Sequence, residues 1–194
     1  KAWRQGCRVE VRGEHQQLAR LDPLLWTFDQ TEFLPHVRLR AGQPIAPEAY
    51  FQLMRDTKQA VVQSSMAPAA YVGPVVYNDK DNFKKVEFGE MDKLATDAKR
   101  KPPYTAKTDN GWVAMIEHYF VNAWLPGQDK REREFYTRKL DSGLYAAGVI
   151  LPMAPIAPGT TGTIKVPLYA GPQEQDVIGK LAPGFDLVVD YGIF

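Results

Sequence analysis

The sequence has a single cysteine and no long hydrophobic run. Cys7 alone excludes an internal disulfide and any metal site built from several cysteines. No apolar stretch approaches the roughly 18 residues that a membrane-spanning helix needs. The 24 Lys and Arg residues nearly balance the 23 Asp and Glu residues, so the chain lacks the basic excess that binds nucleic acid nonspecifically. What is present is globular: 44% of the 194 residues are hydrophobic, enough for the core of one domain or slightly more.

Glycine and proline interrupt the chain often, and no long helix fits between Pro68 and Pro183. Short apolar stretches separated by turn residues favour β-strands, so we predict a mainly β fold after residue 44, a sandwich or a barrel. The stretch 112–125 would also suit a helix, but its aromatic and β-branched residues favour strands. The expected strands cover 49–54, 71–77, 84–88, 112–125, 144–151, 161–170 and 185–190. Short helices are expected at 90–101 and 173–181.

A boundary is expected near Gln43, because Pro44 and Pro47 enforce an extended backbone there. Before this boundary the alternation and spacing of apolar residues indicate both strand and helix. The elements expected there are a strand at 7–12, a helix at 15–26 and a strand at 33–39. Residues 1–43 are therefore predicted to form a short α/β segment, and residues 44–194 a β domain.

Residue types that carry chemistry are few and scattered. His15, His36 and His118 show no metal-ligand spacing. Glu117 and His118 are the nearest candidate acid/base pair, but neighbours in a strand point to opposite faces of the sheet. Cys7 has no basic partner in its local sequence, so a buried structural thiol is favoured over a nucleophile. We therefore predict no catalytic, cofactor-binding or metal-binding residue, and we expect that the chain is not an enzyme.

Three further patterns are interpreted as structural. The stretch 159–165 has glycines and a lysine but lacks the spacing of a phosphate loop, so a turn into a strand is expected. The charge runs 99–101 and 130–134 are expected to be solvated, since they lack the interleaved aromatic residues of a nucleic-acid platform. Four aromatic residues of 112–125 could form a binding patch, although a core is the default expectation. They are Trp112, Tyr119, Phe120 and Trp124.

Residues from about 44 to 194 resemble the large periplasmic domain of the bacterial YidC membrane-protein insertase family. The resemblance lies in stretches that occur in the same order and are spread over about 150 residues. These stretches are 49–53, 73–77, 110–115, 118–126, 135–137, 169–172, 181–183 and 185–192. The last of them is the clearest.

This resemblance implies a partial β-supersandwich, similar to mutarotase-like folds, in a protein that inserts and folds inner-membrane proteins. It implies a place at the periplasmic face of the bacterial inner membrane, with the Sec translocon and its SecDF components as partners. Attachment to the membrane would come from transmembrane segments that this sequence lacks. No cofactor is implied, and no functional residue carries over, because the family's insertion groove lies in its membrane core. A partial sandwich would leave strand edges unpaired, so self-association is expected.

Residues 1–43 resemble a different family, the chi subunit of bacterial DNA polymerase III, a Rossmann-like accessory protein of the clamp loader. The stretches that carry this resemblance are 2–9, 21–22, 25–28 and 33–36. A cytoplasmic replication segment and a periplasmic domain belong to different compartments, so the combination implies a chimera with its junction near Gln43. The strand at 7–12, separated from its own sheet, is expected to pair with an exposed edge of the sandwich or to stay loosely ordered.

Two other functions stay open at this point. A DNA polymerase III accessory subunit would bind the psi subunit and would make the C-terminal domain an unusual extension. A mutarotase-like enzyme or sugar-binding module would need histidine and acidic side chains that converge in a cleft. Only His118 is available for that in the β region.

Overall fold

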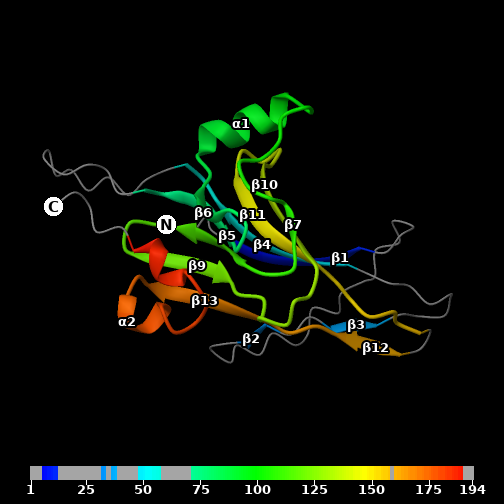
Figure 1. The fold of residues 1–194 in the computed structure, drawn as a ribbon. Helices are drawn as coiled ribbons and strands as arrows, with labels where there is room; N and C mark the ends of the chain where they lie inside the picture. Colours follow the sequence, from blue (N-terminus) through cyan, green and yellow to red (C-terminus); the bar gives the residue numbers. More distant parts are fainter. Residues whose placement is uncertain are drawn as a thin grey trace, which may run out of the picture.

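The computed structural model describes residues 6–12, 32–33, 36–38, 48–57, 71–157 and 160–189, with side chains from residue 48 onward. Antiparallel strands dominate these residues, which confirms the expected mainly β fold (Figure 1). Two larger sheets and one small two-stranded sheet are formed.

The first sheet has five strands in the order β1-β4-β11-β10-β7. Their bounds are β1 Gly6–Arg12, β4 Glu48–Arg55, β11 Tyr145–Pro152, β10 Arg133–Lys139 and β7 Lys107–Thr108. The second sheet has six strands in the order β2-β13-β9-β8-β5-β6. Their bounds are β2 Glu32–Phe33, β13 Val166–Pro172, β9 Phe120–Trp124, β8 Trp112–Ile116, β5 Gly73–Asn78 and β6 Asn82–Lys85. The small sheet pairs β12 Thr161–Thr163 with β3 His36–Arg38. The helices are α1 Phe88–Thr96, α2 Gln175–Ile178 and the 3-10 helix η1 Phe185–Val188.

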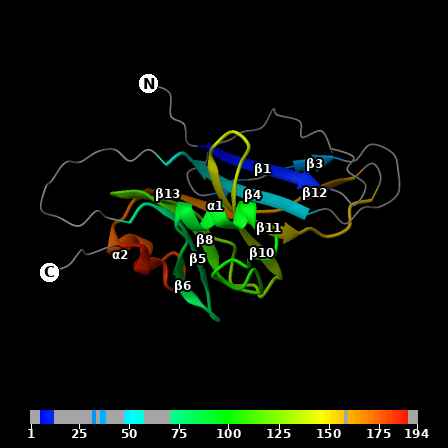
Figure 2. The same cartoon turned by 90° about the horizontal axis from the view of Figure 1, so that it is seen from above.

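The two larger sheets pack face to face and enclose the main core. Side chains alternate along β4, so Phe51 and Leu53 point into this core. The ring of Phe51 meets the ring of Trp124 of β9 edge to face, with centroids 5.0 Å apart. Figure 2 shows β1 and β4 on one side of the domain and β5, β6 and β8 on the other. The arrangement is that of a β-sandwich.

A third layer covers the outer face of the second sheet. The chain after β13, residues 173–189, places Phe185 and Ile178 against that face, where they form a second buried cluster. The ring of Trp112 meets the ring of Phe185 at 5.0 Å, and its indole N–H donates to the carbonyl oxygen of Pro183 at 2.9 Å. All five residues of β8 are therefore buried, with Val113 facing the main core and Trp112 facing the third layer.

The predicted strand at 185–190 is wrong, because this segment forms η1. Gly184 adopts a left-handed φ of 68° directly after Pro183 and turns the chain back onto the sheet. The N–H of Leu187 then donates to the carbonyl oxygen of Gly184 at 3.2 Å, the short-range bonding of a 3-10 turn. The apolar side chains of Phe185 and Val188 are buried, and they belong to this 3-10 turn and not to a strand.

The other expected elements overlap those of the structure, but the expected strand at 33–39 divides into β2 and β3, and β7 and β10 were not predicted. The stretch 112–125 forms β8 and β9, and the expected strand at 161–170 divides into β12 and β13. The strand expected at 7–12 is β1, which pairs with β4 along its whole length, from Gly6 opposite Met54 to Arg12 opposite Glu48. Its pairing with a sandwich edge is thus confirmed. The helix expected at 15–26 lies outside the described residues.

Candidate functional site

The candidate acid/base residues do not converge. His118 lies exposed in the turn between β8 and β9, where its ring meets the ring of Tyr119 at 4.0 Å. The backbone N–H of Glu117 closes this turn by donating to the carbonyl oxygen of Phe120 at 2.8 Å. His36 belongs to β3, and His15 lies outside the described residues. The turn is therefore a structural feature, in which the histidine packs on a tyrosine.

The remaining polar candidates fall on ordinary secondary structure. Cys7 belongs to β1, where its backbone pairs with that of Leu53. Of the stretch 159–165, residues 161–163 form β12, in line with the expected turn into a strand. Among the residues that the structure describes, no group of three or more His, Cys, Asp or Glu side chains could hold a metal ion. No helix among them is long and apolar enough to cross a membrane.

The four aromatic residues of 112–125 divide into two groups. Trp112 and Trp124 are fully buried, one in each core cluster. Tyr119 and Phe120, in the turn and at the start of β9, are 63% and 54% exposed. The expectation of an aromatic core thus holds for the two tryptophans, whereas the tyrosine and the phenylalanine form a surface feature.

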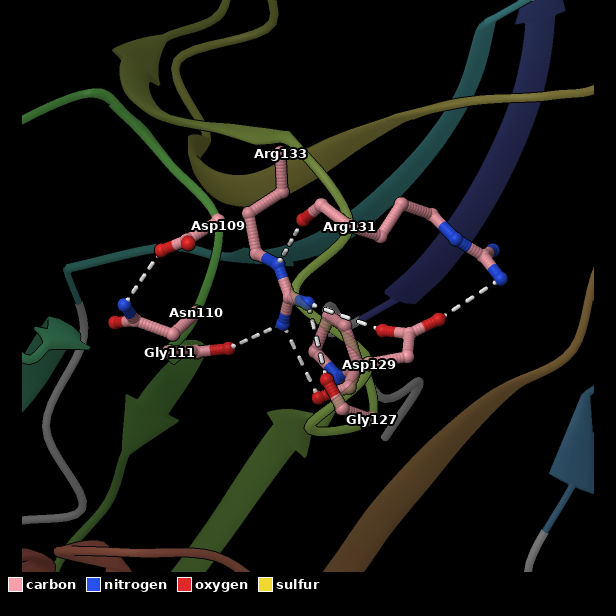
Figure 3. A network of polar contacts seen from close by, with 8 residues as sticks. Asp109, Asn110, Gly111, Gly127, Asp129, Arg131 and Arg133 are labelled. Atoms are coloured by element: carbon pink, nitrogen blue, oxygen red, sulfur yellow. Dashed lines mark hydrogen bonds and ion pairs between the residues drawn. The ribbon is translucent and has the colours of Figure 1, made fainter.

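Arg133 corrects the expectation that residues 130–134 are solvated. Its side chain is fully buried at the first position of β10, while Lys130, Arg131 and Glu132 are exposed and Glu134 is half-buried (Figure 3). Alternation along β10 explains this, because Arg133 shares its face of the strand with the buried Phe135 and Thr137. That period-2 pattern is visible in the sequence and could have revealed the buried arginine.

The guanidinium of Arg133 binds two loops at once, the one before β8 and the one between β9 and β10. It donates to the carbonyl oxygens of Gly111 and Gly127, each at 3.0 Å, and also to those of Pro126 and Arg131. The carboxylate of Asp129 lies 3.4 Å away. Burial lowers the pKa of Arg133, while Asp129 counteracts the shift, and arginine stays charged in proteins regardless. The residue therefore fixes loop geometry and leaves no donor directed at a substrate.

A hollow of about 220 Å³ opens beside the end of β8. It is lined by Tyr71, Phe83, Lys85, Ile116, Leu187, Val188 and Val189. The hydroxyl of Tyr71 donates to the carbonyl oxygen of Pro74 at 2.7 Å and accepts from the N–H of Val86 at 3.1 Å. Burial raises the pKa of Tyr71, so this wall of the hollow stays neutral. Tyr71 and Lys85 contribute the polar side chains of this lining, and the other five residues are apolar.

Residues 26–194 match the sequence profile of the family described as the YidC periplasmic domain. The membrane protein insertase YidC of Aromatoleum aromaticum is 40% identical, over 97% of this chain and 35% of that protein. The protein of the same name from Nitrosospira multiformis is 41% identical, over 87% of this chain and 29% of its own length. That of Dechloromonas aromatica is 48% identical, over 78% and 26% respectively.

The chain spans between 26% and 35% of the length of these relatives. The similarity extends upstream of residue 44, since the profile begins at residue 26 and the Aromatoleum protein matches nearly the whole chain. The resemblance of residues 1–43 to the chi subunit finds no support in these comparisons. The expectation that the chain is not an enzyme is confirmed by its relatives, which are named as insertases. The length and continuity of the match show that the chain belongs to the YidC periplasmic domain family.

Proposed function

We propose that this chain is the periplasmic domain of an inner-membrane insertase and assists the insertion and folding of membrane proteins. The observation that carries the proposal is the 40% identity to a membrane protein insertase over 97% of the chain. The domain would act on the periplasmic side of the inner membrane, outside the membrane-embedded part of the protein.

The role is one of contact rather than of chemistry. The buried Arg133 fixes the loops around Gly111 and Gly127, and the third layer fixes the outer face of the second sheet. A rigid body of this kind suits docking to the Sec translocon and its SecDF components, or shielding an emerging membrane protein.

Photocrosslinking tests this role. The chain replaces the matching segment of the Aromatoleum insertase, and a photoreactive amino acid is placed in turn at the exposed positions Glu132, Asp141 and Lys180. Adducts with translocon components or with a nascent membrane protein are expected from at least one position. Absence of such adducts from every position, with the hybrid protein stably produced, would overturn the accessory role.

The two other functions have less support. A polymerase accessory subunit rests on residues 1–43, and the comparisons give that resemblance no support. For a sugar-binding module the available histidine, His118, is packed on Tyr119 in an exposed turn. A sugar-induced rise in melting temperature would revive the second idea.

The division of the chain near residue 43 stays a prediction. The described strands of the first 43 residues all pair with later ones: β1 with β4, β2 with β13, and β3 with β12. The expected self-association also stays a prediction. Removal of residues 1–43 tests both.

A further inference from the structure

The most exposed large hydrophobic side chains of the described residues sit together at the turn between β8 and β9. Tyr119 is 63% exposed and Phe120 54% exposed, and we name this pair the aromatic tip. Two adjacent aromatic side chains left in water carry an energetic cost that a structural role within the domain does not explain. The aromatic tip therefore calls for an external partner.

The turn that bears the aromatic tip is held in place by two residues, Arg55 and Gln173. The guanidinium of Arg55, from the first sheet, donates to the carbonyl oxygen of Ile116 at 3.4 Å. The side chain of Gln173 donates to the carbonyl oxygens of Glu117 and Phe120 at 2.6 and 3.1 Å. Its backbone N–H donates to the carbonyl oxygen of Tyr119 at 3.0 Å. The exposure of the tip is thus built into the fold, and the aromatic rings are presented without a large ordering cost.

The hollow beside β8 lies next to this turn, because Ile116 lines it and directly precedes the turn. Ile116, the last residue of β8, lines the hollow together with Leu187, which is 48% exposed. Val189, the last described residue of the chain, lies in the same wall. The aromatic tip and the end of the described chain are therefore found at the same end of the second sheet.

The charged residues around the aromatic tip are mostly acidic. Glu117 and His118 belong to the turn, Glu174 and Asp176 follow close to Gln173, and Lys85 borders the hollow. An acidic surface of this kind does not attract an anionic partner. Its recognition chemistry is apolar and aromatic, with polar groups at the rim.

The size of the aromatic tip decides whether its partner is another protein or a lipid surface. Two aromatic side chains bury about 300–500 Å², whereas a stable protein interface needs about 800 Å² from each partner. A lipid surface has no such minimum, and tyrosine and other amphipathic aromatic side chains favour the boundary between headgroups and acyl chains. A weak contact suffices when the rest of the protein holds the domain at the membrane, because tethering raises the effective concentration.

We infer that the aromatic tip inserts into the headgroup region of the membrane leaflet next to the domain and thereby fixes the orientation of the domain on the membrane. This inference rests on the proposed function, which places a membrane next to the domain. Because the local charges are mostly acidic, the contact depends on burial of Tyr119 and Phe120 and gains nothing from anionic lipid.

Vesicle flotation tests the inference on the chain itself. Vesicles of phosphatidylcholine and vesicles of phosphatidylethanolamine with phosphatidylglycerol are compared, each at high lipid concentration. Replacing both residues of the tip, Tyr119→Ser with Phe120→Ser, is expected to reduce partitioning by about tenfold or more on both kinds of vesicle. The matched control is Leu181→Ser, which changes a 46% exposed side chain outside the tip and is expected to leave partitioning unchanged.

A second variant covers the case in which the double replacement perturbs folding. In Tyr119→Trp, brominated lipid is expected to quench more of the fluorescence than in the wild type, whose four tryptophans supply the background and of which Trp112 and Trp124 are buried. Equal flotation of the double variant and the wild type, or no additional quenching in Tyr119→Trp, overturns the inference. Loss of a dimer in the double variant, seen by sedimentation without any vesicle binding, also overturns it in favour of a second copy.

These outcomes are separable from failure of the proposed function. Absence of translocon or substrate adducts in the photocrosslinking experiment would remove the accessory role but would leave flotation unaffected. Failure of flotation would remove the membrane contact and leave the adducts unaffected.

Discussion

The Nη1 atom of Arg133 lies 3.0 Å from the carbonyl oxygen of Gly111, so the first residue of β10 in one sheet holds the residue that precedes β8 in the other. The same guanidinium reaches the carbonyl oxygens of Pro126 and Gly127 in the loop after β9. One buried side chain thus ties together loops at the edge of both sheets.

Arg133→Met is expected to destabilise the domain by about 3 kcal/mol or more, because it leaves several buried carbonyl oxygens without a donor. Chemical denaturation followed by tryptophan fluorescence measures the loss. The control is Arg138→Met, which changes an exposed residue of the same strand. A destabilisation of about 0.5–1 kcal/mol is expected there, because the contact of Arg138 with the ring of Tyr136 is lost. Equal effects of the two variants would contradict the role given to Arg133.

Removal of residues 1–43 is expected to lower the melting temperature and to promote self-association. The truncation exposes the edge of β4, which in the intact chain pairs with β1 over seven residues. Calorimetry and sedimentation of residues 44–194 beside the intact chain give the two readouts. An unchanged melting temperature and a monomer in both samples would show instead that the first 43 residues are a separate appendage, as the predicted boundary implies.

The domain is expected to lose stability in acid, in part through Asp92. Its carboxylate accepts hydrogen bonds from the ammonium of Lys139 at 2.9 Å and from the hydroxyl of Tyr145 at 2.8 Å, which lower the pKa of Asp92. A pKa that is lower in the folded state than in the unfolded state, where it is about 3.9, stabilises the fold above that value. This contribution disappears as the pH falls through the folded pKa.

Asp92→Asn should therefore flatten the dependence of melting temperature on pH below about pH 5. The matched control is Asp141→Asn, which removes the same charge from an exposed position in the turn between β10 and β11. If both variants kept the wild-type slope, the ion pair and hydrogen bond of Asp92 would contribute nothing to acid stability.

Gly184→Ala is expected to loosen the third layer. Gly184 has a φ of 68°, and an added Cβ would lie 2.3 Å from the ring of Tyr77. Gly143→Ala provides the comparison, since Gly143 has a φ of 78° but no atom within 4 Å of an added Cβ. We expect about 1 kcal/mol of destabilisation at Gly143 and clearly more at Gly184.

The readout specific to the third layer is hydrogen exchange of the Trp112 indole N–H, which donates to the carbonyl oxygen of Pro183. Faster exchange is expected in Gly184→Ala and not in Gly143→Ala. The reverse order would show that the turn at Gly184 does not hold the segment 173–189 on the sheet.

The sequence predicts a strand well where one face of that strand is buried and its other face is exposed. Phe51 and Leu53 alternate with more polar neighbours, and β4 follows that pattern. β8 gives no such alternation, because the sandwich core covers Val113 and the third layer covers Trp112. A helix and a strand therefore remained possible for 112–125 until the packing was known.

Tertiary contacts explain the features that the sequence did not reveal. The apolar residues around Phe185 look like a strand, but Gly184 turns them onto the second sheet as a 3-10 helix. The exposure of Tyr119 and Phe120 follows from hydrogen bonds that Gln173 makes more than fifty residues along the chain. Local patterns do not encode contacts of that range.

Cysteine labelling in intact cells tests the proposed periplasmic location most directly. The chain, with Cys7→Ser and Asp141→Cys, replaces the matching segment of the Aromatoleum insertase, and a membrane-impermeant maleimide is added to spheroplasts. A periplasmic domain predicts labelling of the exposed cysteine before lysis, to the same extent as after lysis. Labelling only after lysis would place the domain on the cytoplasmic side and would contradict the account.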